Sequence, residues 1–293
     1  MQTYTRREII KKGARLAAGT ALGTMGLPLL GCSGDTNSAD TLARAALEPT
    51  TLENLKLTVL YDNNYYKEGL KVDWGFACLV EGLDHTILFD TGRHDTFLLS
   101  NLQSLNVDPA RIDDIVISHK HMDHTGGLDT LVDMRIGKNV YLVKSLIFGL
   151  QGKLDAYGAT LKLVDAPRVI TKSALSTGSM KRVLISEQGL IVLTDRGAIL
   201  VVGCSHPGIV EMVARTRQIT KTGVLLVIGG FHLLNLYAPD VEGIVAGLKK
   251  EGVRYVAPTH CTGTEARRIF AAGFGEHYID CGVGRVITAG DLA

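Results

Sequence analysis

The chain has 293 residues, and 46% of them are hydrophobic, which is ample to fill a folded core. Its 31 Lys and Arg residues balance 30 Asp and Glu residues, so the formal net charge is only +1. Such a balance provides no basic field for a nucleic-acid backbone, and we therefore expect no nucleic-acid partner.

The N-terminal segment predicts export. Residues 5–11, with the sequence TRREIIK, resemble a twin-arginine export signal, and residues 16–30 follow without a charge. This uncharged stretch is too short to span a bilayer comfortably and is typical of the apolar region of a signal. The sequence LLGC that ends at Cys32 resembles a lipobox. We therefore expect residues 1–32 to be a signal and acylated Cys32 to anchor an exported, extracytoplasmic lipoprotein to the membrane.

The next segment is expected to connect the anchor to a folded body. Residues 33–52 are rich in Gly, Ser, Thr, Asp and Ala and predict a flexible tether. Residues 53–293 are then expected to form one catalytic domain of the α/β class, because about 240 residues is a normal size for such a domain.

Two apolar strands lead to the most informative part of the chain. Residues 86–89 predict a strand that ends at Asp90, and residues 112–117 predict a second buried strand. The second strand is followed directly by His119-Lys120-His121-Met122-Asp123-His124, which places three His and one Asp within six residues. That density of potential ligands indicates a metal site.

The spacing of this motif predicts how the ligands divide. In an extended segment, residues two apart point the same way, so His119 and His121 can present their imidazoles to one ion. Asp123 and His124 follow in a turn that the glycines at 126 and 127 allow, and they could hold a second ion. Imidazole and carboxylate ligands favour zinc first, with iron or manganese as alternatives, and the lack of a Cys pair argues against a closed structural zinc site.

Two later histidines also follow strands. Residues 190–193 and 198–202 are apolar runs joined by a four-residue turn, which predicts a hairpin whose second strand delivers His206 beyond its tip. His260 follows the apolar residues 255–257 and precedes Gly263, which opens a predicted helix. A lone His after a strand is usually a surface residue, so their role depends on the motif at 119–124.

The segment from Ser118 to Gly127, with its HxHxDH core, resembles the signature of the metallo-β-lactamase superfamily of binuclear metallohydrolases. Three further segments match in the order that this superfamily implies: LFDTG at 88–92, GCSH at 203–206 and PTH at 258–260. The resemblance implies a four-layer αββα sandwich. It also implies two divalent ions, one held by His119, His121 and His206, the other by Asp123, His124 and His260. Asp90 is then expected to orient the metal-binding loop.

One departure from the superfamily pattern concerns the bridging ligand. Many binuclear members carry an aspartate after a strand between the third and last histidines, but here residues 224–228 lead into Gly229-Gly230-Phe231-His232. Asp240 lies eight residues past His232, in an expected helix, and is a poor substitute. Three consequences stay open: solvent alone bridges the ions, the second ion is weakly held, or His232 becomes a ligand.

The motifs GGFH at 229–232 and THCTG at 259–263 are similar to the branch that includes dihydropterin ribofuranosylaminobenzene phosphate synthases. The expected export favours a hydrolase instead, in which a metal-activated hydroxide attacks an ester, lactone or phosphoester and Asp123 or His232 handles the proton of the leaving group. A pterin-type transferase is the alternative, with Trp74 as a residue that could stack on a flat ring. A noncatalytic metal-binding lipoprotein is the third possibility.

The cysteines that flank the expected ligands are not assigned to the site. Cys204 and Cys261 each lie next to such a residue, and either could approach a metal. A buried thiol that only packs is the more common role, so we expect neither to be a ligand.

Overall fold

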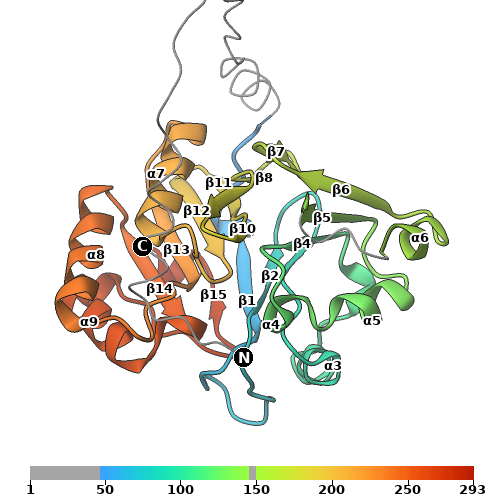
Figure 1. Ribbon diagram of the computed structural model, residues 1–293, viewed down its shortest axis with the longest axis horizontal. Coiled ribbons are helices and arrows are strands. Elements are labelled where there is room, and N and C mark those ends of the chain that lie inside the picture. The colour runs from blue at the N-terminus through green and yellow to red at the C-terminus, as the bar shows by residue number, and fades with distance from the viewer. Residues whose placement is uncertain (1–46, 145–149) are drawn as a thin grey trace, which may run out of the picture. The chain divides into compact units, whose positions relative to one another are not determined.

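The computed structural model describes residues 47–144 and 150–293. The export signal, Cys32 and residues 33–46 of the expected tether therefore lie outside the described residues. Among the helices that the structure describes, none combines the length and the apolar character needed to cross a membrane. The described part contains two large β-sheets that pack face to face, with helices on their outer sides (Figure 1).

The first sheet has seven strands and carries the histidine-rich motif. Its strands β3 to β6 are parallel, whereas β15, β1, β2 and β3 pair antiparallel. Strands β3 and β4 are buried along their whole length, which explains why their sequences are continuous apolar runs rather than alternating ones. In spatial order the strands are β15 (Val286–Ile287), β1 (Lys56–Tyr61), β2 (Ala77–Glu81), β3 (Ile87–Phe89), β4 (Asp114–Ile117), β5 (Asn139–Val143) and β6 (Thr160–Val164).

The second sheet has six strands, of which β12, β13 and β14 are parallel. The predicted hairpin is confirmed, because β11 pairs antiparallel with β12 and Thr194 faces Gly197 across the turn. A separate two-stranded hairpin joins β9 (Met180–Arg182) to β10 (Ile185–Glu187). The strands of the second sheet, in spatial order, are β14 (Tyr255–Thr259), β13 (Val224–Gly230), β12 (Gly197–Val202), β11 (Leu190–Thr194), β8 (Ala174–Ser176) and β7 (Arg168–Val169).

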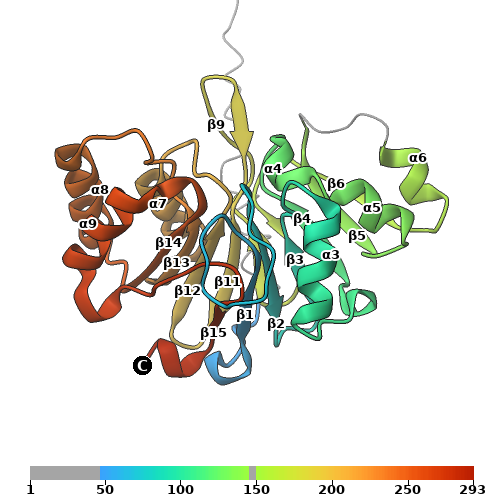
Figure 2. The same ribbon diagram turned by 90° about the horizontal axis from the view of Figure 1, so that it is seen from below.

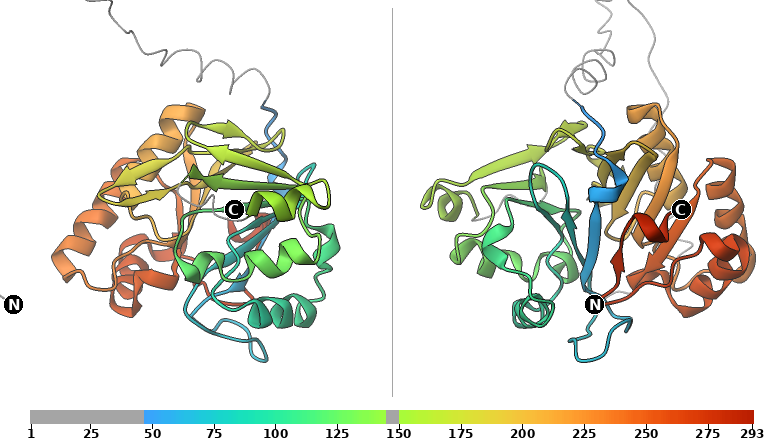
Figure 3. Two further views of the ribbon diagram at one scale, coloured as in Figure 1. Left: turned by 45° about the vertical axis from the view of Figure 1, so that its right-hand side comes forward. Right: turned by 180° about the vertical axis from the view of Figure 1, so that it is seen from behind.

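Three apolar clusters separate the layers. The largest lies between the sheets and joins residues such as Val59 and Phe89 of the first sheet to Ile199 and Ile228 of the second. The other two lie under the helices on the outer faces (Figures 2 and 3). The first sheet is covered by α3 (Asp95–Ser104), α5 (Leu128–Asp133) and α6 (Leu150–Asp155), and the second by α7 (Ile209–Thr220), α8 (Ala238–Lys250) and α9 (Thr264–Phe274). This is the predicted four-layer αββα arrangement.

The last residues of the expected tether make tertiary contacts. The backbone of Glu48 and Thr50 is hydrogen-bonded to Lys172 and Leu193, and Leu52 is buried at 1% exposure. Residues 48–52 therefore belong to the folded body rather than to a tether that lasts until residue 52. The composition of this segment suggested a linker, but one buried leucine and five backbone groups, hydrogen-bonded to residues 172–173 and 193–195, attach it to the body.

The topology brings the predicted site residues to one edge. Asp90 and the motif at 119–124 follow β3 and β4, which are parallel, while His206, His232 and His260 follow β12, β13 and β14, which are also parallel. Because the carboxyl ends of parallel strands lie at the same edge of a sheet, each sheet presents its loops together. The two sheets pack so that these loops face each other.

Candidate metal centre

The HxHxDH motif is divided by the start of a short helix. His119 and His121 lie on extended backbone after β4, and α4 (Met122–Thr125) begins directly after His121. Asp123 and His124 are therefore in a short helix, where the sequence predicted a turn. This change of backbone direction turns the second half of the motif away from the first, and the ligands form two clusters instead of one.

The first group, which we call the three-histidine cluster, consists of His119, His121 and His206. Nε2 of His119 and Nδ1 of His121 are 3.0 Å apart, and the ring of His206 lies 4.6 Å from that of His119 and 5.0 Å from that of His121. One nitrogen of each residue lies within 4.8 Å of the others, as ligands of a single ion must. All three histidines that the resemblance assigned to one metal are thus together.

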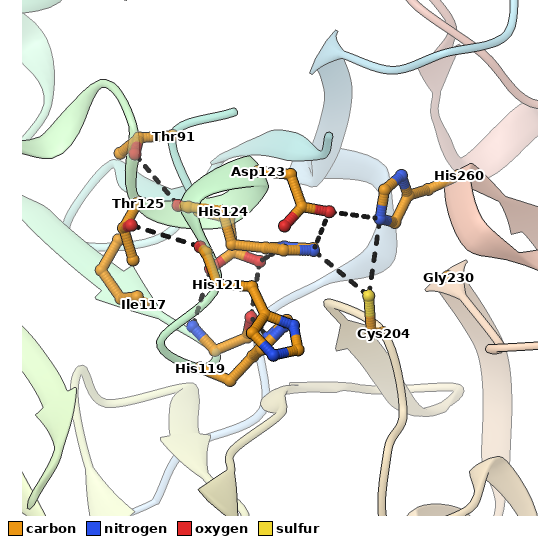
Figure 4. Close-up of polar contacts among 12 residues, drawn as sticks. Thr91, Ile117, His119, His121, Asp123, His124, Thr125, Cys204, Gly230 and His260 are labelled. Atoms are coloured by element: carbon orange, nitrogen blue, oxygen red, sulfur yellow. Dashed lines mark hydrogen bonds and ion pairs between the residues drawn. The ribbon is translucent and has the colours of Figure 1, made fainter. Parts of the chain in front are cut away.

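The second group, the cysteine-containing cluster, consists of Asp123, His124, His260 and Cys204. Asp123 Oδ2 is 3.5 Å from His124 Nε2 and 3.3 Å from His260 Nε2. The sulfur of Cys204 lies 3.2 Å from His124 Nε2 and 3.5 Å from His260 Nε2 (Figure 4). The three residues expected from the sequence are therefore together, and Cys204, which we expected only to pack, stands among them.

Four of the five histidines in these clusters have their other ring nitrogen fixed. Nδ1 of His119 contacts Ser118 Oγ at 2.9 Å, and Nδ1 of His260 contacts Asn63 Oδ1 at 2.8 Å. Nδ1 of His124 and of His206 each contacts a carboxylate, from Asp90 and Glu187 respectively. Such partners orient the ring and leave Nε2 free to bind a metal ion.

Asp90 connects Ser118, which precedes the HxHxDH motif, to His124 in α4. Its carboxylate is fully buried and accepts hydrogen bonds at 2.7 Å from the backbone N–H and the hydroxyl of Ser118, and its Oδ2 lies 2.7 Å from His124 Nδ1. Its backbone has a positive φ of 58°, which a residue other than Gly rarely adopts. These contacts agree with the expectation that Asp90 orients the loop, which stays a prediction.

Glu187 holds the opposite side of the site and was missed by the sequence analysis. It ends β10, is fully buried, and accepts from the backbone N–H groups of Cys204, Ser205 and His206 at 2.8–2.9 Å. Its Oε2 also lies 2.8 Å from His206 Nδ1. The only sequence signal is an acidic residue beside the apolar run 190–193, which is too common to identify a site.

The charges of the two clusters differ. Burial lowers the pKa of His119 and of His121, so these imidazoles are neutral and ready to bind a metal ion. Burial would also lower the pKa of His124, but the carboxylates of Asp90 and Asp123 raise it to about 10. Burial opposes ionisation of Asp123, yet the hydrogen bonds from His124 and His260 hold its pKa well below the usual range. The carboxylates thus favour a positive charge in the cysteine-containing cluster, whether a proton or a metal ion.

The end of β13 offers no side chain to the site. A Cβ added to Gly230 would lie 2.5 Å from the carbonyl oxygen of Gly203 and 2.6 Å from the sulfur of Cys261. Real Cβ atoms do not approach other atoms so closely, so a carboxylate could not be placed here without moving β12 or Cys261. Asp240 is exposed in α8. The departure noticed in the sequence therefore has a steric reason.

His232 lies beside the three-histidine cluster. Its ring is 4.6 Å from that of His206, and the residue is exposed. A nitrogen of His232, the sulfur of Cys204 and a nitrogen of His206 also lie within 4.8 Å of one another. The hydrogen bond with Cys261 raises the pKa of His232. An exposed imidazole in this place can exchange a proton with a bound molecule or with solvent.

A cavity of about 1070 Å³ opens beside these histidines. His206 and His232 line its inner end, and Arg182 and Val183 of the β9–β10 hairpin line another part together with Leu236. The tip of the hairpin is unusually apolar for a surface turn, because Val183 is 82% exposed and adjacent Leu184 is 78% exposed. Trp74 lies elsewhere, with its ring 4.8 Å from that of His260.

Comparison with known proteins agrees with this geometry. A family model described as "Metallo-beta-lactamase superfamily" matches residues 75–184. The crystal structure of Tm1679, a metal-dependent hydrolase of the beta-lactamase superfamily, is 30% identical and covers 80% of this chain and 98% of its own, with a TM-score of 0.68. The chain belongs to the metallo-β-lactamase superfamily.

Two further proteins extend the comparison. The chain is 29% identical over 286 residues to a 7,8-dihydropterin-6-methyl-4-(beta-D-ribofuranosyl)-aminobenzene-5'-phosphate synthase of Methanocaldococcus jannaschii, covering 80% of this chain and 97% of that protein. The metallo-beta-lactamase fold protein YhfI of Bacillus subtilis is 16% identical, with a TM-score of 0.58 over 80% of this chain and 99% of its own. The second likeness concerns the fold alone.

The residues present fit divalent metal ions. Zinc bound to nitrogen at about 2.0–2.1 Å and to sulfur at about 2.3 Å in a tetrahedron places neighbouring ligand atoms roughly 3.3–3.6 Å apart. The measured separations in the cysteine-containing cluster are 3.2–3.5 Å. Imidazole nitrogens, a carboxylate and a thiol are also the ligand types that zinc prefers.

Proposed function

We propose that this protein is a metal-dependent hydrolase that cleaves an ester, a lactone or a phosphoester of a small molecule. Two divalent ions, zinc first and iron or manganese as alternatives, would be held by the two ligand clusters. The observation that carries this proposal is the pair of ligand clusters, with four imidazoles already oriented by neighbouring side chains and with His206 in the wall of a cavity. An ordinary polar surface would not fix so many rings.

Ions in these clusters would supply a water nucleophile at neutral pH and polarise the substrate oxygen. The protein's own side chains hold the expected metal ligands in place. Glu187 holds the backbone of residues 204–206, Asp90 holds Ser118 and His124, and both carboxylates are fully buried. The ligand positions are therefore fixed before a substrate arrives, which lowers the cost of reorganisation during the reaction.

His232 and Asp123 are the candidates for proton transfer. His232 is exposed in the cavity and its hydrogen bond with Cys261 raises its pKa, so it can hold a proton near neutral pH and donate it to a leaving group. Asp123 contacts His124 and His260 through Oδ2. Its other oxygen is the atom that could accept a proton from water. We assign the donation of a proton to the leaving group to His232, because this residue lines the cavity.

The cavity suggests a substrate with an apolar part. Val183, Leu236 and Ile244 line it, and Arg182 is the cation of the hairpin that lies in its wall. An acyl chain or ring would pack on the apolar side chains, and a phosphate or carboxylate would pair with Arg182. The proposal therefore favours a substrate that carries both an apolar group and an anionic or ester group.

A pterin-type transferase is the second candidate. It is supported by the 29% identity to the synthase of Methanocaldococcus jannaschii, which extends over 97% of that protein. Trp74, which is 37% exposed beside His260, offers a surface for a flat ring. We rank it second because the N-terminal sequence suggests export, whereas activated pterins are expected in the cytoplasm.

We further propose that the protein is exported by the twin-arginine route and anchored by acylated Cys32. Mass spectrometry of the protein isolated from its native membranes would find Cys32 as an acylated first residue. A soluble chain that retains residues 1–31 would contradict this proposal and would favour the transferase.

Turnover on a mixed panel tests the proposed function. The purified full-length chain would be incubated with esters, lactones, phosphomonoesters, phosphodiesters and a dihydropterin pyrophosphate, with and without chelator. Chelator-sensitive hydrolysis of one class is the expected result. Pterin transfer without hydrolysis would favour the second candidate, and no turnover by metal-loaded protein would favour a noncatalytic role.

A further inference from the structure

We propose that the Cys204 thiolate is the fourth protein ligand of the ion held by Asp123, His124 and His260. The cysteine-containing cluster would then enclose its ion in protein atoms, while the three-histidine cluster keeps an open position for water and substrate. This inference rests on the proposal that the site binds divalent ions, but it does not depend on which bond the enzyme cleaves.

The distances around the sulfur are compatible with those between ligands of one ion. Cys204 Sγ is 3.2 Å from His124 Nε2 and 3.5 Å from His260 Nε2, and Asp123 Oδ2 is 3.5 Å and 3.3 Å from the same two nitrogens. These four separations match four of the six edges of a zinc tetrahedron, which are expected at about 3.3–3.6 Å, and all four ligand atoms lie within 4.8 Å of one another. Both imidazoles present Nε2, because their Nδ1 atoms contact Asp90 and Asn63.

The backbone keeps the sulfur in this position. The N–H groups of Cys204 and of Ser205 both donate to Glu187 Oε1, and the hydroxyl of Ser205 donates to the carbonyl of Gly230 at 2.8 Å. Ser205 has a positive φ of 60°, so the backbone between Cys204 and His206 is not an extended strand. One loop therefore supplies a ligand to each cluster.

The thiol comes from the strand next to β13, which offers no carboxylate. Many members of the superfamily bring a bridging aspartate to the metals from the strand that corresponds to β13, but Gly230 has no room for a side chain. Cys204 approaches instead from the end of β12, the neighbouring strand. Its single sulfur contacts the two histidines of one cluster, so it completes one coordination shell.

Cys261 provides a matched control. Its sulfur donates to the backbone carbonyl of Cys204 at 3.7 Å, and it is equally buried at 4% exposure. It does not belong to either ligand cluster. The two thiols are equally buried and adjacent, so an effect of Cys204 that Cys261 does not reproduce reports coordination rather than burial.

An ion with four protein ligands and an ion with a free coordination position have different roles. Structural zinc sites are saturated by four protein ligands, whereas catalytic sites use three and keep the fourth position free. By this rule the ion of the three-histidine cluster would bind the nucleophile. The ion of the cysteine-containing cluster would supply positive charge beside it.

The test is the optical spectrum of the cobalt protein, which requires no substrate. The full-length chain would be stripped of metal under reducing conditions and titrated with Co²⁺ alone. As the sulfur–cobalt bond forms, the thiol proton passes to the buffer, and a thiolate-to-cobalt charge-transfer band appears in the near ultraviolet. We expect this band in the wild type and in Cys261→Ala, and its loss in Cys204→Ser.

Binding constants from the same titration add a second readout. Cys204→Ser should weaken one of two Co²⁺ sites by at least about a hundredfold, more than the loss of an outer hydrogen-bonding partner costs, and leave the other within about threefold. Circular dichroism would check that the variant is folded. X-ray absorption on the zinc-loaded wild type, which needs no variant, should find sulfur in the coordination shell.

Three outcomes would overturn the proposal: a band that survives in Cys204→Ser, a band lost only in Cys261→Ala, or a zinc-loaded wild type without sulfur coordination. These results are independent of hydrolysis. An enzyme that hydrolyses its substrate but has no sulfur–metal bond contradicts this inference alone, and a sulfur-ligated protein without turnover contradicts only the proposed function.

Discussion

The two ligand clusters use the same loops but differ in composition and exposure. The three-histidine cluster has only neutral ligands, and His206 and neighbouring His232 face the cavity. The cysteine-containing cluster adds a carboxylate and a thiol, and three of its four residues are buried. A site with anionic ligands and no open side holds an ion tightly, whereas a neutral site with an open side allows exchange of water and substrate. In our proposal, the single loop at residues 204–206 would give two adjacent ions different roles.

The largest effect is expected from removing a ligand of the open cluster. His121→Gln should reduce turnover by more than about a hundredfold, because the loss of a ligand exceeds what outer partners cost, while the cobalt–thiolate band persists. Turnover and the Co²⁺ spectrum would be measured on the same preparation. The control is Lys120→Gln, which changes an exposed residue of the same loop. Normal turnover by His121→Gln would contradict the proposal that the ion of the three-histidine cluster binds the nucleophile.

The two buried carboxylates allow a finer separation of the clusters. Glu187→Gln should weaken the ion of the three-histidine cluster about 10–100-fold and the other ion less, because an amide N–H at the Oε2 position would face the N–H groups of His206, while the remaining oxygen still accepts from Cys204 and Ser205. Asp90→Asn should affect the cysteine-containing cluster in the same way, through His124. Two-phase Co²⁺ titrations would measure both. Equal weakening of both ions by either variant would show that the clusters are not independently supported.

A smaller effect is expected at the open side of the site. Arg182→Gln should raise KM several-fold for an anionic substrate and leave kcat nearly unchanged, because Arg182 lines the cavity without contacting the ligand clusters. Lys181→Gln, the exposed neighbour on β9, is the matched control. A large fall in kcat with Arg182→Gln would mean that this residue contributes to the transition state and not only to binding.

The smallest expected effect is the pH dependence of stability that His85 causes. The hydrogen bond with Asp114 raises the pKa of His85 above its usual value of 6.5, at a position outside both clusters. The pair therefore stabilises the fold fully below pH 6.5, and this contribution is lost as the pH rises through the raised pKa. Because the His85 side chain is 40% exposed, solvent screening limits the loss to about 1 kcal/mol at most. Urea unfolding of the wild type and of His85→Gln between pH 6 and pH 9 should converge as the pH rises; a constant difference would contradict this.

Much of the fold followed from the sequence because its strands are continuous apolar runs with clear ends. The strands before Asp90 and His119, the hairpin at 190–202 and the helix after Gly263 are all present. The six expected ligands are also brought together, because the HxHxDH motif is contiguous and the other two histidines follow parallel strands. Periodicity and position at a strand end were sufficient for these features.

Cys204 and Glu187 could not be predicted in the same way. The direction of the Cys204 side chain depends on the positive φ of Ser205, and no residue type signals that conformation at a serine. Glu187 contacts the site only because the β9–β10 hairpin returns toward the end of β12. Residues 48–52 resembled a linker in composition, and only the tertiary hydrogen bonds place them in the domain. Each of these features depends on contacts between distant segments.

The most direct test of the account is a stepwise reconstitution in which turnover and metal content are followed together. Metal-free protein would receive Zn²⁺ in increments, with the substrate found in the panel. The account predicts that the tightly bound first ion restores little turnover, and that activity rises as the second, weaker site fills. Full activity after the first ion, or activity that does not depend on metal, would contradict the claim that the reaction takes place at the open three-histidine cluster.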